Sequence, residues 1–159
     1  MKNHEKKIPL RLRSVYIRES KALMAQDFFP TIVGQNLVGE FRVNPGTVPP
    51  TIYDGVRPNE APTTVLEFSP YFEFRYHRGV TPELISDESV CASISMQIAL
   101  EYTLLEGKIP RLDDMDAWLE HEVLAQAWPY WQEFCHSTML RMNLPVMRAP
   151  ILDLMAEKI

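Results

Sequence analysis

The adjacent pair Cys135 and His136 is the most reactive combination in the chain, a thiol beside a base. A cysteine nucleophile needs its base within hydrogen-bond reach. Both residues fall in a predicted helix, where consecutive side chains point about 100° apart and do not face each other. Cys135 also lies on the apolar side of that helix, and buried thiols are inert. The pair therefore predicts a structural cysteine and not a nucleophile.

A second candidate for acid–base chemistry is His121 with the carboxylates of Glu122 and Glu133. Such a site also needs a nucleophile or a phosphate-binding loop to act on a substrate. The sequence supplies no serine motif and no glycine-rich phosphate loop that would complete it. We therefore expect that the protein is not an enzyme.

Metal-binding spacing is absent as well. The four histidines are His4, His77, His121 and His136. They fall on different predicted elements, and no two have the i, i+4 spacing that puts two ligands on one helix face. Cys91 and Cys135 lie 44 residues apart without a CxxC motif, which favours two free thiols. We expect no metal and no cofactor.

Length and composition limit the class of protein. The 159 residues are 46% hydrophobic, enough for one domain with an ordinary core. A net charge of −5 and a pI near 5.4 argue against nucleic-acid binding, which needs a basic surface. No apolar run approaches the roughly 18 to 20 residues of a membrane span, and no signal sequence follows the basic start. We expect a cytoplasmic protein with a flexible N-terminus over residues 1–7.

The cysteine and histidine candidates belong to a helix predicted over residues 128–143. Its less polar positions follow helical spacing: Trp131, Phe134, Cys135, Thr138, Met139 and Met142. Pro129 is tolerated in a first turn, so we expect the helix to begin there, after a break or kink in a preceding helix. A short apolar helix is expected over 149–159. Residues 112–159 are thus predicted to be the helical portion.

Alternating apolar and polar residues predict strands before this helical portion. The segments are residues 8–19, 35–43, 64–76 and 89–104. The first inverts its alternation near Ser14, which predicts a β-bulge. Strands followed by helices indicate a single α+β domain over 1–159, with a four-stranded antiparallel sheet and packed C-terminal helices.

Two segments are open between a structural and a binding role. Residues 44–62 contain five prolines and two glycines and predict a long connection, either an arm lining a groove or a plain surface loop. Arg11, Arg13 and Arg18 suit the solvated side of a strand, or contact with acidic partner segments.

The chain resembles the SecB export chaperone and its SecB-like relatives. Trp128-Pro129-Tyr130 is similar to that family's Phe-Pro-Tyr helix motif, and Ala149-Pro150 to its Ala-Pro step into a last helix. Glu133 and Cys135 resemble the Arg-Glu-Cys region with an offset of one position. Arg13-Ser14-Val15-Tyr16 resembles the Arg-Ile-Tyr of the first strand. With the strand order, the resemblance extends over residues 8–156.

The resemblance implies a SecB-like homotetramer, a dimer of dimers, that binds unfolded client proteins along apolar grooves without ATP. In the export chaperone, acidic residues on the sheet face dock the secretion motor ATPase. Glu19 matches one of them, but Leu23, Ser95 and Gln97 stand at the other positions. SecB-like relatives also act as chaperones of antitoxins in toxin–antitoxin–chaperone systems. The implied partner is therefore an exported protein or a cognate antitoxin.

Aromatic rings and methionines suit a groove of this kind, because they adapt to many client sequences. The expected client-binding residues are Phe41, Phe68, Phe72, Phe74, Tyr76, Trp118, Trp131, Met139, Met142, Leu152 and Met155. The expected contacts between protomers are Ile94, Met96, Ile98, Tyr130 and Phe134. Large apolar residues are usually buried, so core is the alternative for each. Taken one by one, these residues favour core or subunit interface; a groove is expected because one sheet face and three helices offer more apolar area than one domain covers.

An alternative function is a small-ligand-binding or catalytic α+β protein. In that interpretation the gap between sheet and helices holds a pocket, with His121 or His136 inside it. The two hypotheses differ in what fills the gap and in whether the chain assembles.

Overall fold

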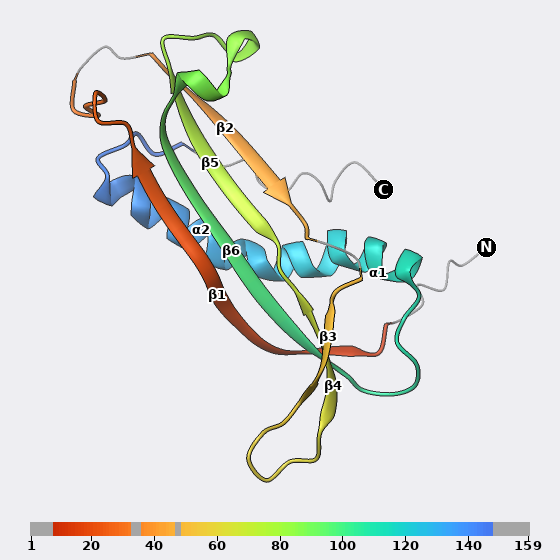
Figure 1. The fold of residues 1–159 in the computed structure, drawn as a ribbon. Helices are drawn as coiled ribbons and strands as arrows, with labels where there is room; N and C mark the ends of the chain where they lie inside the picture. The colour runs from red at the N-terminus through yellow and green to blue at the C-terminus, as the bar shows by residue number, and fades with distance from the viewer. Residues whose placement is uncertain (1–7, 33–35, 47–48, 148–159) are drawn as a thin grey trace.

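The structure, a computed structural model, describes residues 8–32, 36–46 and 49–147. One antiparallel sheet of six strands lies against one long helical segment (Figure 1). The strands are β1 (Leu10–Met24), β2 (Leu37–Asn44), β3 (Thr51–Gly55), β4 (Thr63–Phe68), β5 (Tyr71–Arg78) and β6 (Val90–Leu104). Two short 3-10 turns, η1 (Pro82–Leu84) and η2 (Asp87–Ser89), connect β5 to β6. The α+β class predicted from the order of elements is confirmed.

The sheet is organised around β6. One edge of β6 pairs with β1 along almost its whole length, and the other edge pairs first with β5 and then with β4. β2 continues the sheet beyond β5, and β3 continues it beyond β4. Among the described strands β1 has no partner on its far side, so its outer edge is open.

The prediction of four strands is wrong, because one predicted strand is divided at a proline and one predicted loop contains a strand. Pro70 separates β4 from β5, although both pair with β6 and the Pro70 carbonyl still accepts a hydrogen bond from Ile98 N at 3.0 Å. The predicted connection over residues 44–62 contains β3, which pairs with β4 as a hairpin. Its prolines flank β3 and do not interrupt it, so only residues 56–62 form the hairpin turn.

β1 is longer than predicted and carries two bulges. Its register with β6 skips one residue between Leu12 and Ser14 and another between Ile17 and Glu19. The first shift confirms the inversion predicted near Ser14; the second was not predicted. Arg13 and Arg18 are the extra residues at the two shifts, and an extra residue re-aims its side chain.

The helical segment runs from Leu112 to Arg141 without interruption. It consists of α1 (Leu112–Trp118), a π-helical turn (Leu119–Val123) and α2 (Leu124–Arg141). The predicted break at Trp128-Pro129 is wrong, since Pro129 lies inside α2. Pro129 is exposed, so the carbonyl that loses its helical partner faces solvent. The helix predicted over 149–159 and the N-terminus over 1–7 lie outside the described residues.

α2 crosses one face of the sheet, here called the inner face (Figure 1). Its buried positions are Leu124, Ala127, Trp131, Cys135, Thr138 and Met139, the spacing of one helix side. Directly opposite residues on neighbouring strands share a face, so Phe72 and Met96 lie on the inner face together. The core forms between these two surfaces. No helix in the described segments is long and apolar enough to cross a membrane.

Candidate functional site

The reactive residues singled out in the sequence do not meet. Cys135 is buried, and burial raises the pKa of its thiol to about 12, while His136 on the same helix is exposed. His121 and Glu133 are exposed as well, so neither histidine of the alternative hypothesis lines the gap between sheet and helix. Within the ranges that the structure describes, no three His, Cys, Asp or Glu residues are grouped so that they could hold a metal ion.

Aromatic rings fill the gap between α2 and the sheet. Trp131 stacks on Phe72 with ring centroids 5.6 Å apart, and Trp128 meets the edge of Phe41 at 5.6 Å. Phe134 extends the set on the far side of Trp131. We call Phe41, Phe72, Trp128, Trp131 and Phe134 the aromatic layer. It seals the gap from solvent at its centre and leaves Phe41, Trp128 and Phe134 partly exposed at its margins.

The Trp131 indole N–H is buried in this layer without a hydrogen-bond partner among the described residues. An unsatisfied buried donor costs about 1–3 kcal/mol. Its neighbours are aromatic rings, which offer no strong acceptor. The centre of the aromatic layer therefore has an unused polar group that a carbonyl oxygen would satisfy.

A second group of rings lies under α1. Tyr102 and Trp118 are 4.5 Å apart between centroids, and Phe68 packs on both. The Tyr102 hydroxyl donates to Gln126 Oε1 at 2.7 Å, which satisfies it within the core. Trp118 is only partly buried, so this group also reaches the surface at one margin.

Most residues predicted to bind clients are buried within the single chain. The buried ones are Phe68, Phe72, Phe74, Tyr76, Trp131 and Met139. Phe41, Trp118 and Met142 are partly exposed, and Leu152 and Met155 lie outside the described residues. Of the predicted protomer contacts, Ile94, Met96 and Ile98 are buried, Phe134 is partly buried and Tyr130 is 48% exposed.

The uncovered apolar surface lies elsewhere, on the second half of β1. Every residue from Ile17 to Met24 is exposed, including Ile17 at 53% and Leu23 at 61%. Ile17 is directly opposite Ile98, which is fully buried, so it lies on the inner face beyond the reach of α2. The sequence did not predict this strip, because residues 20–24 show no clear alternation of apolar and polar residues. An edge strand that is exposed on both faces can lack such alternation.

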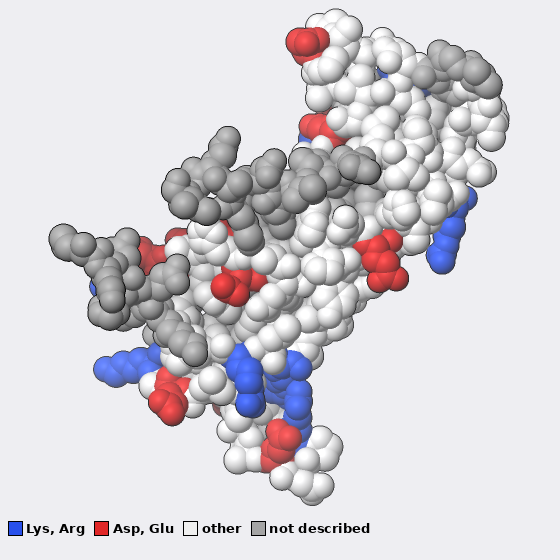
Figure 2. All heavy atoms as spheres, turned by 180° about the vertical axis from the view of Figure 1, so that it is seen from behind, with Lys and Arg blue, Asp and Glu red and all other residues white. Residues whose placement is uncertain are grey.

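The surface over α2 is also poor in charge. α2 contains only two charged residues, Glu133 and Arg141. Seen from behind the sheet, few Lys, Arg, Asp or Glu side chains cover this side (Figure 2). Tyr130 and Leu140 expose about half of their surface there. Apolar groups therefore remain on both layers of the domain.

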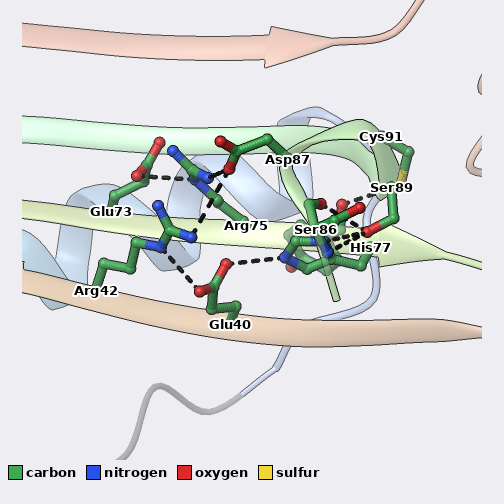
Figure 3. A network of polar contacts seen from close by, with 10 residues as sticks. Glu40, Arg42, Glu73, Arg75, His77, Ser86, Asp87, Ser89 and Cys91 are labelled. Atoms are coloured by element: carbon green, nitrogen blue, oxygen red, sulfur yellow. Dashed lines mark hydrogen bonds and ion pairs between the residues drawn. The ribbon is translucent and has the colours of Figure 1, made fainter. Parts of the chain in front are cut away.

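The opposite, outer face of the sheet is polar and ordered. At one end, Arg42 and Arg75 share the carboxylate of Asp87, and each also pairs with a glutamate, Glu40 or Glu73 (Figure 3). These ion pairs tie β2 and β5 to the η2 turn. Each of these charged groups has at least one partner of opposite sign.

His77 lies beneath this network and is 1% exposed (Figure 3). Its Nδ1 is 2.8 Å from Ser89 Oγ, which is also within hydrogen-bond distance of the Ser86 carbonyl. Its Nε2 is 2.9 Å from Glu40. Burial acts to raise the pKa of the Glu40 carboxyl, but hydrogen bonds with Arg42 and His77 outweigh it and lower that pKa. His77 therefore links Glu40 on β2 to Ser89 and anchors the η2 turn.

In the middle of the outer face, Glu67 and Glu101 are directly opposite on β4 and β6. Arg18 Nη2 donates to Glu67 at 2.6 Å, and the Tyr16 hydroxyl donates to the same carboxylate at 2.7 Å. Burial, and then a hydrogen bond to Glu101, raise the pKa of Tyr53 to about 12. Two like charges are thus held together by donors from β1 and β3.

The largest cleft among those described lies between the end of β2 and α1. It has a volume of about 550 Å³ and is lined by Leu112 and Leu119 together with acidic side chains. The acidic residues are Asp113, Asp116 and Glu120. The cleft is open and combines apolar walls with a negative rim, which suits a polypeptide better than an enclosed small ligand.

Comparison with known proteins supports the fold. No protein-family model matches the chain, and no curated protein matches it by sequence. Among solved structures, the SecB-like chaperone Rv1957 of Mycobacterium tuberculosis, in complex with a ChAD peptide from the Rv1956 HigA1 antitoxin, is similar with a TM-score of 0.60. The similarity covers 91% of this chain and 91% of that chain at 16% sequence identity. Taken with the strand order and the long helix, the chain has a SecB-like fold.

Proposed function

We propose that the protein is an ATP-independent holdase chaperone that binds extended, apolar segments of unfolded client polypeptides in the cytoplasm. The observation that carries the proposal is a SecB-like fold whose longest edge strand leaves core-facing side chains uncovered. An exposed apolar strip of this kind marks an interaction surface, since monomeric proteins rarely leave one open.

Binding at β1 follows from strand chemistry. The outer edge of β1 offers backbone N–H and C=O groups that an extended client can pair with, independently of client sequence. On the inner face, Ile17 and Met24 then supply apolar contacts for alternate client side chains, and Leu23 exposes a further apolar group on the outer face. The margins of the aromatic layer extend the apolar area, and methionine and aromatic groups adapt to varied clients.

The client is proposed to be a cognate antitoxin. The similar Rv1957 structure contains a peptide from an antitoxin, which favours this partner over an exported protein. The docking of the secretion motor ATPase has less support. Glu19 is already paired with Lys21, and Leu23, Ser95 and Gln97 on the same face carry no charge. Purification with the protein encoded by a neighbouring gene tests the antitoxin as client; a stable complex with one dominant partner is expected.

The chain is proposed to assemble as a homotetramer through the low-charge side of α2. Tyr130 and Phe134, one helical turn apart, would contact a second copy. Oligomers with large apolar interfaces commonly leave further apolar patches at their margins. Native mass measurement tests this arrangement, and a monomer at micromolar concentration would contradict it.

Light scattering from an aggregating unfolded protein tests the chaperone activity. We expect suppression near one tetramer per client without any nucleotide. The double variant Ile17→Thr/Met24→Thr removes apolar area but keeps strand-forming residues, and should lose most of the suppression. Leu84→Thr is the matched control, because Leu84 is even more exposed, at 69% against 53% for Ile17 and 36% for Met24, but lies on η1 and not on β1. If the unaltered protein does not suppress the aggregation, the proposal is contradicted.

A further inference from the structure

Three arginines converge on one pocket at the hairpin end of the outer face. The pocket has a volume of about 270 Å³, and Arg11 and Arg13 of β1 line it together with Arg57 from the β3–β4 turn. The hydroxyls of Thr63 and Thr103 also line it. Guanidinium and hydroxyl groups are donors, so the pocket is built to accept oxygen anions.

Most other arginines of the described ranges form ion pairs with carboxylates, but these three do not. Nine arginines lie in the described ranges, and five of them form ion pairs: Arg18, Arg42, Arg75, Arg78 and Arg111. Of the four for which the described residues provide no ion pair, three line this pocket and only Arg141 lies elsewhere. Glu60 also lines the pocket but is not within ion-pair distance of any of the three.

The guanidinium groups are positioned by the fold. Arg13 is the extra residue of the first bulge, and its guanidinium lies against Gly55, where a Cβ atom would come 2.0 Å from Arg13 Nη1. Only a glycine leaves that space open. Arg57 Nη2 in turn donates to the Arg13 carbonyl at 3.4 Å. Two of the three cations are therefore tied to one backbone site on β1.

The surroundings indicate what kind of anion fits. Three positive charges close together repel one another, and an anionic group would relieve that repulsion. Exposed apolar side chains lie beside them: Leu12 lines the pocket, and Val56, the neighbour of Arg57, is 68% exposed. The open β1 edge runs past the same place. A free inorganic anion would contact only the positive charges. An acidic polypeptide segment would contact the charges, the apolar side chains and the open strand edge.

We infer that this arginine pocket binds carboxylate side chains of an acidic, partly apolar segment of an extended client polypeptide. The inference rests on the proposed function and adds a charge preference to it. The pocket then fixes one end of the client, while the strip on the second half of β1 holds the apolar part. Because the charges are exposed, the preference weakens as salt is added.

Fluorescence anisotropy with the full chain tests the inference, using two labelled peptides of equal length, one alternating Glu and Leu and the other alternating Gln and Leu. At low salt the acidic peptide should bind about tenfold more tightly. The double variant Arg11→Gln/Arg57→Gln should bind both peptides equally. Arg141→Gln, which removes the unpaired arginine outside the pocket, should keep the preference.

Equal affinity of the unaltered protein for the two peptides overturns the inference but leaves the holdase proposal standing, if aggregation of an uncharged client is still suppressed. If neither peptide binds and aggregation of the uncharged client is not suppressed, the inference and the holdase proposal are both overturned. Displacement of the acidic peptide by inorganic phosphate at the same concentration as by free acidic peptide identifies a simple anion site and also overturns the inference. Unfolding midpoints of the variants show that lost binding is not lost folding.

Discussion

The two bulges of β1 each turn one arginine onto the outer face, and the two arginines meet different surroundings. Arg18 reaches Glu67, a carboxylate that is 7% exposed and also accepts from Tyr16. Arg13 reaches Gly55 and two further arginines. The same backbone device therefore completes an ion pair at one position and leaves unmatched charge at the other.

This difference separates charges that are paired within the chain and stabilise the fold from charges that remain available to a partner. Along the middle and the far end of the sheet, arginine and hydroxyl donors match the carboxylates, and the network of Figure 3 fixes a turn. At the hairpin end the fold gathers three arginines, and Glu60, which also lines their pocket, forms no ion pair with them. Charge that the chain leaves unmatched is the part that an outside partner can use.

Lowering the pH should have the largest effect on stability, because it protonates the carboxylates that hold the ion-paired regions together. Hydrogen bonds from Arg78 hold the pKa of Asp27 low, and donors outweigh burial to do the same for Glu40 and Glu67. A depressed pKa adds stability above the unfolded-state value, and that stability is lost as pH falls through the folded-state value. Urea midpoints between about pH 7 and pH 3 should fall, and Glu67→Gln should flatten the curve while Arg13→Gln should not.

Removing the partner of Arg18 should have the next largest effect. Glu67→Ala deletes an acceptor of three side-chain donors, Arg18, Tyr16 and Ser69, and should lower the free energy of unfolding by about 2 kcal/mol. Chemical denaturation measures it. Glu60→Ala is the matched control, since Glu60 is exposed and outside any ion pair within the described residues. Equal stability of the two variants would show that the paired bulge is no better anchored than the unpaired one.

Gly55→Ala should affect the unpaired bulge and cost about 1 kcal/mol, at the low end for overpacking. The added methyl would meet Arg13 Nη1 at 2.0 Å and Val65 Cγ2 at 2.6 Å, and the arginine can move away. Its displacement should also abolish the preference for acidic peptide. Retained preference would contradict the placement of Arg13. Gly79→Ala is a poor control because Gly79 has a positive φ of 67° and would be strained for a different reason.

The smallest effect should come from Arg11→Gln or Arg57→Gln. Removing one of three like charges relieves repulsion, so stability should stay level or rise by a few tenths of a kcal/mol. A matched substitution at a paired site, Arg75→Gln, should instead lower it, because Glu73 and Asp87 lose their common partner. Precise urea midpoints at low salt show whether each variant is more or less stable than the unaltered protein. A clear loss of stability in Arg57→Gln would mean that the pocket already has an intramolecular partner.

Local sequence patterns predicted most of the fold. Alternation located β2, β5 and β6, and the inverted pattern near Ser14 located the first bulge. The helical spacing from Trp131 to Met139 identified the buried side of α2. These features depend on neighbours two to four residues apart, which a single sequence displays.

Features that depend on distant partners were missed. β3 is a strand because β4 lies beside it, and its own five residues between prolines carry little pattern. Pro129 stays inside α2 because Trp128 and Trp131 anchor the helix to Phe41 and Phe72 on both sides of it. The arginine pocket needs Arg57, 44 residues after Arg13, and no local signal brings the two together.

The position of β6 near the end of the sheet-forming sequence has a consequence for biosynthesis. Leu10 pairs with Leu104, so β1 leaves the ribosome long before the strand that it joins. Until then the chain can form only local hairpins such as β3–β4, and contacts so distant in sequence form slowly. A nascent chain of this kind exposes unpaired strand edges during translation, so we expect it to be prone to aggregation until β6 is complete.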